Sequence, residues 1–146
     1  MGKLLDRIFR LEEINGANRC PTYLYRWTLL KLWAGRGLYL HHFIGDDWSL
    51  DLHDHPKRFV SIGLKGKYLE TTPSGSKVYQ APWIRTFPAD HIHRLSMIDG
   101  GDCWTLVIVL KAVRDWGFWH DGLFIQWRRY VKGDQKELAD KMKACP

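Results

Sequence analysis

Turn residues interrupt the chain at short intervals between residues 23 and 130, and this spacing restricts the fold more than any other feature of the sequence. Apolar segments such as YLYRWTLLKLW, LYLHHFIG and CWTLVIVLK alternate with the turn sequences AGRG, DDWS, PSGS and DGGD. Strands broken about every 8–12 residues by Gly, Pro or Asp are typical of all-β sandwiches and barrels. We therefore expect an antiparallel β-barrel over about residues 23–130. Gly66 is expected to form a turn between the strands RFVSIGLKG and KYLETT, and FIQWRRYV to form the last strand.

Both ends of the chain have a helical pattern. Apolar residues recur at helical spacing within residues 2–13, directly before the turn sequence NG. Residues 134–144 begin with Asp134 as a candidate N-cap and carry Glu137 three residues later, as in a capping box. A chain of 146 residues without a repeat or a linker fits one domain. We expect a single domain over 1–146, in which short N- and C-terminal helices flank the barrel.

The composition favours a folded globular protein. The chain is 45% hydrophobic and 14% aromatic, which excludes a disordered class. Its formal net charge of +6 is spread over separate clusters such as Lys57/Arg58 and Arg128/Arg129. Because there is no concentrated basic arm, nucleic acid is not an expected partner.

Cysteine usage and hydropathy bear on the compartment. The three cysteines, Cys20, Cys103 and Cys145, are odd in number and lack metal-type spacing, which favours a reduced protein. No run approaches the roughly 18 apolar residues of a membrane span, and the charged start has no signal-peptide core. The sequence thus predicts a cytoplasmic protein with no membrane partner.

Two His-x-His pairs are the segments that most suggest chemistry. His53 and His55 would point the same way from an extended segment, about 6.5–7 Å apart along the strand, and His91 and His93 repeat this spacing. If two hairpins bring both segments to one wall, three imidazoles with an open position would suit Zn, Fe, Ni or Cu. The alternative is that these are ordinary hydrogen-bonded strand histidines, which are common.

These residues resemble the motifs of the cupin superfamily, small antiparallel barrels of the jelly-roll type. The first cupin motif contains a His-x-His pair and a later glycine, which His53, His55 and Gly66 match, and Pro88 and His93 match the second motif. The segments LHDHPKRFVSIGLKGKYLE, HRL, CWTLVIV and VRDWGFW are similar to short, uncharacterised single-domain cupins of bacteria and phages. The resemblance implies an all-β, cupin-type jelly-roll β-barrel.

The sequence departs from the cupin pattern at the glutamate of the first motif, where Phe59 stands. The resemblance then implies a neutral ligand set of His53, His55 and His93, with Phe59 in an apolar pocket wall. It implies one divalent transition metal (Fe, Zn or Ni) inside the barrel. In ligand type this set is similar to the cysteine-dioxygenase branch, in which three histidines hold iron.

Three neighbouring residues are candidates to support the ligands. His91 lies on the same face as His93 and is a candidate fourth ligand or hydrogen-bond donor beside it. Asp51 and Asp90 are candidates to hold the remote ring nitrogens of ligand histidines. Asp54 points away from the first His-x-His pair, so we expect it at the surface or in a turn.

Other polar residues keep two interpretations. Arg85 and Arg94 either bind a substrate carboxylate or lie exposed on strands. His41 and His42 are adjacent, so only one of them faces inward. Cys103 begins an apolar strand and is expected to be a small buried residue.

The resemblance does not fix an activity, because cupins include oxygenases, isomerases, epimerases and binding modules. The leading hypothesis is a metal-dependent dioxygenase whose small-molecule substrate and O2 both take open metal positions. The alternatives are a non-enzymatic metal- or small-molecule-binding module, and a sugar-type isomerase or epimerase with a pocket histidine as base. A homodimer is a further expectation, since many cupins pair through strand exchange.

Overall fold

The computed structural model describes residues 10–15 and 21–132. Its strands and helices follow one another along the chain as β1 (Arg10–Asn15), β2 (Thr22–Lys31), η2 (Trp33–Gly35), β3 (Gly37–Phe43), β4 (Leu52–His53), β5 (Lys57–Thr72), β6 (Gly75–Gln80), β7 (Trp83–Phe87), β8 (Arg94–Met97), β9 (Cys103–Ala112), β10 (Gly117–His120), β11 (Leu123–Gln126) and α2 (Trp127–Lys132).

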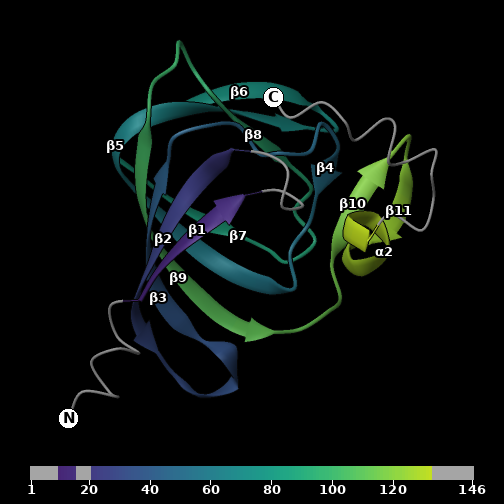
Figure 1. Cartoon of the computed structure of the whole chain (residues 1–146), viewed down its shortest axis with the longest axis horizontal. Helices are drawn as coiled ribbons and strands as arrows, with labels where there is room; N and C mark the ends of the chain where they lie inside the picture. The colour runs from purple at the N-terminus through teal and green to yellow at the C-terminus, as the bar shows by residue number, and fades with distance from the viewer. Residues whose placement is uncertain (1–9, 16–20, 133–146) are drawn as a thin grey trace.

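Two antiparallel sheets build the fold. The larger sheet has the order β1-β2-β3-β9-β5-β6, and β7 and β8 also pair with β5. The smaller sheet has the order β11-β10-β4 and lies with α2 at one side of the barrel (Figure 1). The curled arrangement confirms the all-β barrel predicted from the turn spacing and the jelly-roll type implied by the family resemblance.

The prediction of a turn at Gly66 is wrong, because β5 runs through this position as one strand of 16 residues. Gly66 has a φ of +84°, a left-handed conformation that glycine adopts without a side-chain penalty. The chain bends there but keeps its ladder. The first part of β5 pairs with β7, and the part after Gly66 pairs with β6 and β8.

The predicted N-terminal helix is wrong over residues 10–13, which belong to β1. This segment pairs with β2 residue by residue, and Glu12 accepts a hydrogen bond from Nε of Arg26 at 2.8 Å. Sheet pairing overrides the helical spacing of the apolar residues. The rest of that helix and the predicted helix over 134–144 lie outside the described residues. The predicted last strand ends at Gln126, where α2 begins.

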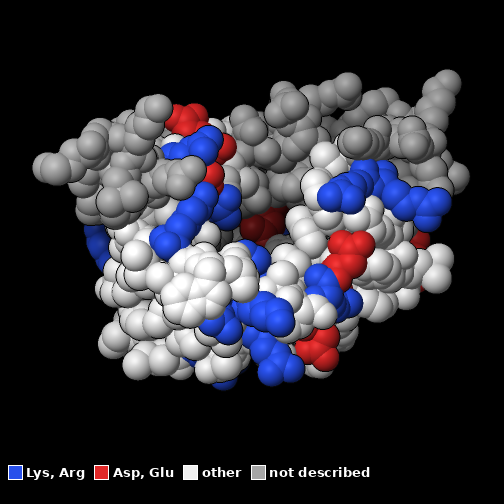
Figure 2. Space-filling model, turned by 90° about the horizontal axis from the view of Figure 1, so that it is seen from below, with Lys and Arg blue, Asp and Glu red and all other residues white. Residues whose placement is uncertain are grey.

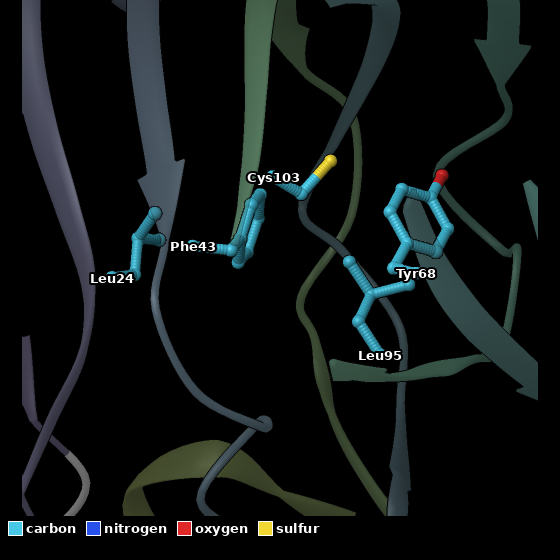
Figure 3. Packing of buried hydrophobic residues seen from close by; sticks show 5 residues of the cluster. All are labelled: Leu24, Phe43, Tyr68, Leu95 and Cys103. Atoms are coloured by element: carbon cyan, nitrogen blue, oxygen red, sulfur yellow. The ribbon is translucent and has the colours of Figure 1, made fainter. Parts of the chain in front are cut away.

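Buried apolar side chains fill one part of the barrel interior. Leu24, Phe43, Tyr68, Leu95 and Cys103 come from different strands and form a single cluster (Figure 3). Cys103 is fully buried, and burial raises the pKa of its thiol to about 12. The cysteine is therefore a packing residue, as the sequence predicted.

No helix among the described residues has the length and the apolar character needed to span a membrane.

Alanine substitutions at two glycines with left-handed backbone test how closely β5 approaches its neighbour at Gly66. A Cβ at Gly66 would lie 2.0 Å from the carbonyl oxygen of Asp102, whereas a Cβ at Gly100, whose φ is +67°, would meet nothing within 4 Å. We expect Gly100→Ala to lower the free energy of unfolding by about 1–2 kcal/mol through the strained φ alone. Gly66→Ala should lower it by at least about 3 kcal/mol, since the clash adds to the strain.

Urea unfolding of both variants measures the difference. Equal losses of stability would contradict the close approach between β5 and the carbonyl of Asp102.

Candidate metal centre and cavity

Backbone hydrogen bonds bring the two histidine segments together. His53, at the end of β4, and His93, just before β8, exchange N–H···O=C bonds of 2.9 Å in both directions. The N–H of His55 donates to the carbonyl of Ala89 at 3.1 Å. Sequence segments about 40 residues apart are thus fixed side by side by their main chains.

The three imidazoles of His53, His55 and His93 converge on one point. One ring nitrogen of each residue lies within 4.8 Å of the corresponding nitrogens of the other two. Nε2 of His55 lies 2.9 Å from Nε2 of His93, and the ring centroids are 5.0–5.1 Å apart. The structure therefore brings together all three residues that the sequence indicated as metal ligands.

Glu70, which the sequence analysis missed, holds the other side of His93. Its Oε1 lies 2.7 Å from Nδ1 of His93 and 2.9 Å from Nε2 of His91, and its Oε2 accepts a hydrogen bond from Arg85 at 2.6 Å. A carboxylate can only accept here, so Nδ1 of His93 carries a hydrogen, which leaves Nε2 as the ring nitrogen available to a metal. In the strand KYLETT, period-2 alternation places Glu70 on the same face as Tyr68, and this was the signal available in the sequence.

The environment keeps these groups in the ionisation states that metal binding needs. Burial lowers the pKa of His53 to about 4, with the nearby Asp47 opposing the shift. Burial is the main cause that lowers the pKa of His55 well below 6.5, and the neighbouring His53 and His93 rings act in the same direction. Both rings are neutral at pH 7. Burial acts to raise the pKa of Glu70, but hydrogen bonds from its neighbours outweigh this and lower it to about 2.

A cavity of about 450 Å³ opens beside the three histidines. Phe59 lies in its wall, 4.9 Å from the His55 ring and stacked on Phe87 at 4.6 Å. Arg26 and Lys57 also line it. The surface is hollowed on the face seen in Figure 2, with Lys and Arg side chains beside the hollow. The volume suits a small organic molecule.

The aspartates suggested as ligand supports lie elsewhere. Asp51 contacts Nδ1 of His120 at 3.0 Å and accepts a hydrogen bond from the Tyr130 hydroxyl at 2.6 Å. Asp90 is exposed. Within the described part of the chain, neither side chain hydrogen-bonds to a histidine of the converging set. Because β4 pairs with β10, the chain before His53 directs Asp51 toward that strand.

The prediction that Asp54 lies at the surface is wrong. Asp54 is fully buried and bonds to Arg114 at 2.7 Å, to the N–H of Gly117 at 2.9 Å and to Nε1 of Trp119 at 3.1 Å. It does point away from the histidine pair, but β10 covers that side. Asp54 therefore ties the histidine segment to the smaller sheet.

The two arginines and the adjacent histidines that the sequence left with two interpretations make specific contacts. Arg85 donates to Tyr68 at 2.8 Å as well as to Glu70, and Arg94 donates to the carbonyl of Ser49 at 2.7 Å. His41 faces the cavity, whereas His42 contacts Asp102 on the other side of the sheet. The expectation that only one of the two histidines faces inward is confirmed.

Comparison with known proteins identifies the fold. No family model and no curated protein matches the sequence. The chain is similar in structure to the polyketide cyclase RemF from Streptomyces resistomycificus, with 16% identity, 90% of this chain and 91% of that chain covered, and a TM-score of 0.58. It is also similar to an RmlC-like cupin from Shewanella frigidimarina (17% identity, 69% and 82% covered, TM-score 0.52). A predicted oxalate decarboxylase from Thermotoga maritima is a third (14% identity, 70% and 93% covered, TM-score 0.56). The chain therefore shares the fold of these structures, one of which is an RmlC-like cupin.

Proposed function

We propose that the protein binds one divalent transition metal through His53, His55 and His93 and acts on a small molecule held in the adjoining cavity. The convergence of three ring nitrogens within 4.8 Å of one another, beside a cavity of about 450 Å³, carries this proposal. The structural relatives include proteins described as a polyketide cyclase and a predicted oxalate decarboxylase, which supports a small-molecule ligand.

The donor set fits a metal ion. At the tetrahedral angle two nitrogen ligands about 2.1 Å from a metal would lie roughly 3.4 Å apart, and at right angles, as in octahedral coordination, roughly 3.0 Å apart. The 2.9 Å between Nε2 of His55 and Nε2 of His93 matches the right-angle separation. Neutral imidazoles suit Zn, Fe and Ni.

A second cluster, formed by Glu70, His91 and His93, is a weaker candidate. Both oxygens of Glu70 already accept hydrogen bonds, from the two histidines and from Arg85. Glu70 therefore serves better as the group that orients His93 than as a ligand, an arrangement common around metal-bound histidines.

Within this proposal, the finer hypothesis is a three-histidine dioxygenase. The bound metal would supply Lewis acidity and a place for O2 beside the substrate. The chain's own contribution is a neutral donor set and an aromatic wall, which includes Phe59 and Phe87 and restricts water around the substrate. An oxidation that incorporates both atoms of O2 needs no further reductant.

We further propose that two copies pair through the outer face of the larger sheet. Inward-facing Arg26, His41 and Thr105 alternate with outward-facing Trp27, Leu40 and Leu106, so the face turned away from the cavity also carries apolar residues. One outward row crosses six strands in register and consists of Leu11, Trp27, Leu40, Leu106, Ile62 and Ile84.

The size of this outer face and the charges at its two ends favour a second copy of the chain as its partner. Six strands about 4.8 Å apart and up to about 33 Å long give a face near the 800 Å² that each partner of a stable dimer buries. The next outward row begins with the acidic Glu13 on β1 and ends with the basic Lys65 on β5. A two-fold axis along the strands would place Glu13 opposite Lys65 of the partner subunit.

The ligand assignment predicts the metal content of variants. His53→Ala and His93→Ala should each abolish stoichiometric metal in protein purified from metal-supplemented culture, since two imidazoles hold a divalent ion far more weakly than three. His120→Ala, which removes a histidine that contacts Asp51, should keep full occupancy and serves as the control. Elemental analysis measures the content.

Full occupancy in both ligand variants would overturn the site. In the wild type, tight iron with substrate-dependent O2 uptake supports the dioxygenase. Zinc without turnover favours a binding module, and activity that survives chelation favours an isomerase or epimerase.

The role of Glu70 in orienting the His93 ring predicts a partial loss of zinc affinity when Glu70 is replaced. Glu70→Gln should weaken zinc binding by roughly 10–100-fold, because the ring of His93 loses its charged acceptor. Glu12→Gln, on β1, should leave zinc affinity unchanged. Competition with a chromophoric chelator gives both dissociation constants, and equal affinity of Glu70→Gln and the wild type would contradict the role.

The proposed pairing of two copies predicts the molecular mass of the protein in solution. Light scattering after size exclusion should give twice the chain mass for the wild type. Ile108→Lys, at a position 40% exposed on the outer face of β9, should give a single chain with an unchanged fold. Leu123→Lys, at a position 70% exposed on β11, should remain dimeric. A monomeric wild type, or a dimeric Ile108→Lys, would refute the pairing.

A further inference from the structure

One stretch of the barrel wall contains buried polar atoms that have no hydrogen-bond partner among the described residues. Among the described residues, three buried side-chain atoms have no hydrogen-bond partner: Oγ1 of Thr28, Nε2 of His41 and Oγ1 of Thr105. Leaving such a group unpaired away from water costs about 1–3 kcal/mol, so each one calls for an explanation.

Two of the three atoms belong to neighbouring side chains that face the cavity. His41 on β3 lies directly opposite Thr105 on β9, and residues in such pairs have Cβ atoms about 4.5–5.5 Å apart. Both residues line the cavity, whereas Thr28 does not. The polar pair is flanked by apolar lining, with Phe43 edge-on to His41 at 5.8 Å and Val107 two residues beyond Thr105.

We propose that His41 and Thr105 form a binding subsite for one uncharged polar group, a hydroxyl or carbonyl oxygen, of a largely apolar ring-containing ligand. This assignment rests on the proposed function, because the ligand is the small molecule that occupies the cavity beside the metal site. β3 and β4 lie on opposite sides of the barrel, so the ligand spans the cavity between this pair and the three histidines (Figure 1).

The chemistry of the pair selects a neutral group over an anion. Burial, followed by the charge of Arg26, lowers the pKa of His41 to about 3, so the ring is neutral at pH 7. Arg26 itself is paired with Glu12 at 2.7 Å, which compensates its charge. No uncompensated cation lies beside the pair on β2, β3 or β9 at this row of the sheet.

Both members of the pair can adapt to the ligand. A neutral imidazole donates from one nitrogen and accepts at the other, and a threonine hydroxyl does both. The pair can therefore accept from and donate to a hydroxyl, or donate to a carbonyl. The aromatic lining on either side, including Phe43 and Phe59, suits the faces of a flat ring system.

Binding of two probes to zinc-loaded protein tests this subsite. 2-Naphthol carries one hydroxyl on a flat apolar ring system, and naphthalene lacks it. His41→Phe and Thr105→Val should each weaken 2-naphthol binding by roughly 3–10-fold, the worth of one net hydrogen bond, and leave naphthalene binding unchanged or tighter. Thr28→Val removes the matched hydroxyl that does not line the cavity and should change neither affinity. Fluorescence titration measures both.

Three results would overturn the subsite: equal weakening of both probes, an effect of Thr28→Val as large as that of Thr105→Val, or no binding of 2-naphthol to the wild type. Zinc content, measured on every sample, distinguishes a failure of the subsite from a failure of the proposed function. The subsite variants keep stoichiometric zinc if the metal site is correct, and a wild type that fails to hold zinc refutes the metal site instead.

Discussion

The hydrogen bond between Glu70 and His93 connects the interior chemistry of this barrel to its framework. Glu70 lies on the part of β5 beyond the Gly66 bend, and His93 lies in the segment before β8 that is bonded to β4. The 2.7 Å contact fixes the orientation of the His93 ring and leaves its Nε2 facing His55. Arg85 neutralises Glu70 from β7, so three strands and one loop cooperate to position a single imidazole.

The larger sheet carries apolar residues on both of its faces. A sheet with one face in water carries its polar residues on that face. Here polar residues such as Arg26, His41 and Thr105 share the inner face with apolar residues such as Phe43 and Val107. The outer face holds an apolar row from Leu11 to Ile84. His41 and Thr105 on the inner face form the proposed ligand subsite, and the outer row is the surface through which we propose that two copies pair.

The sequence was sufficient for those features that depend on local pattern. Turn spacing predicted the strands, and the i, i+2 spacing indicated that His53 and His55 would share a face. Contacts between segments that lie far apart in the sequence could not be predicted from local pattern. Nothing near Glu70 in the sequence reveals that it meets His93, because the bend at Gly66 and the pairing of β5 with β8 bring them together. The same reason explains Asp54, whose buried position depends on β10, more than 60 residues later.

X-ray absorption spectroscopy of the freshly purified wild-type protein tests the central claim most directly, because it reports the atoms bound to the metal. For zinc, we predict three imidazole nitrogens at about 2.0–2.1 Å from the metal and no sulfur ligand. A stoichiometric metal with sulfur neighbours at about 2.3 Å, or with fewer than three imidazoles, would contradict a site built from His53, His55 and His93.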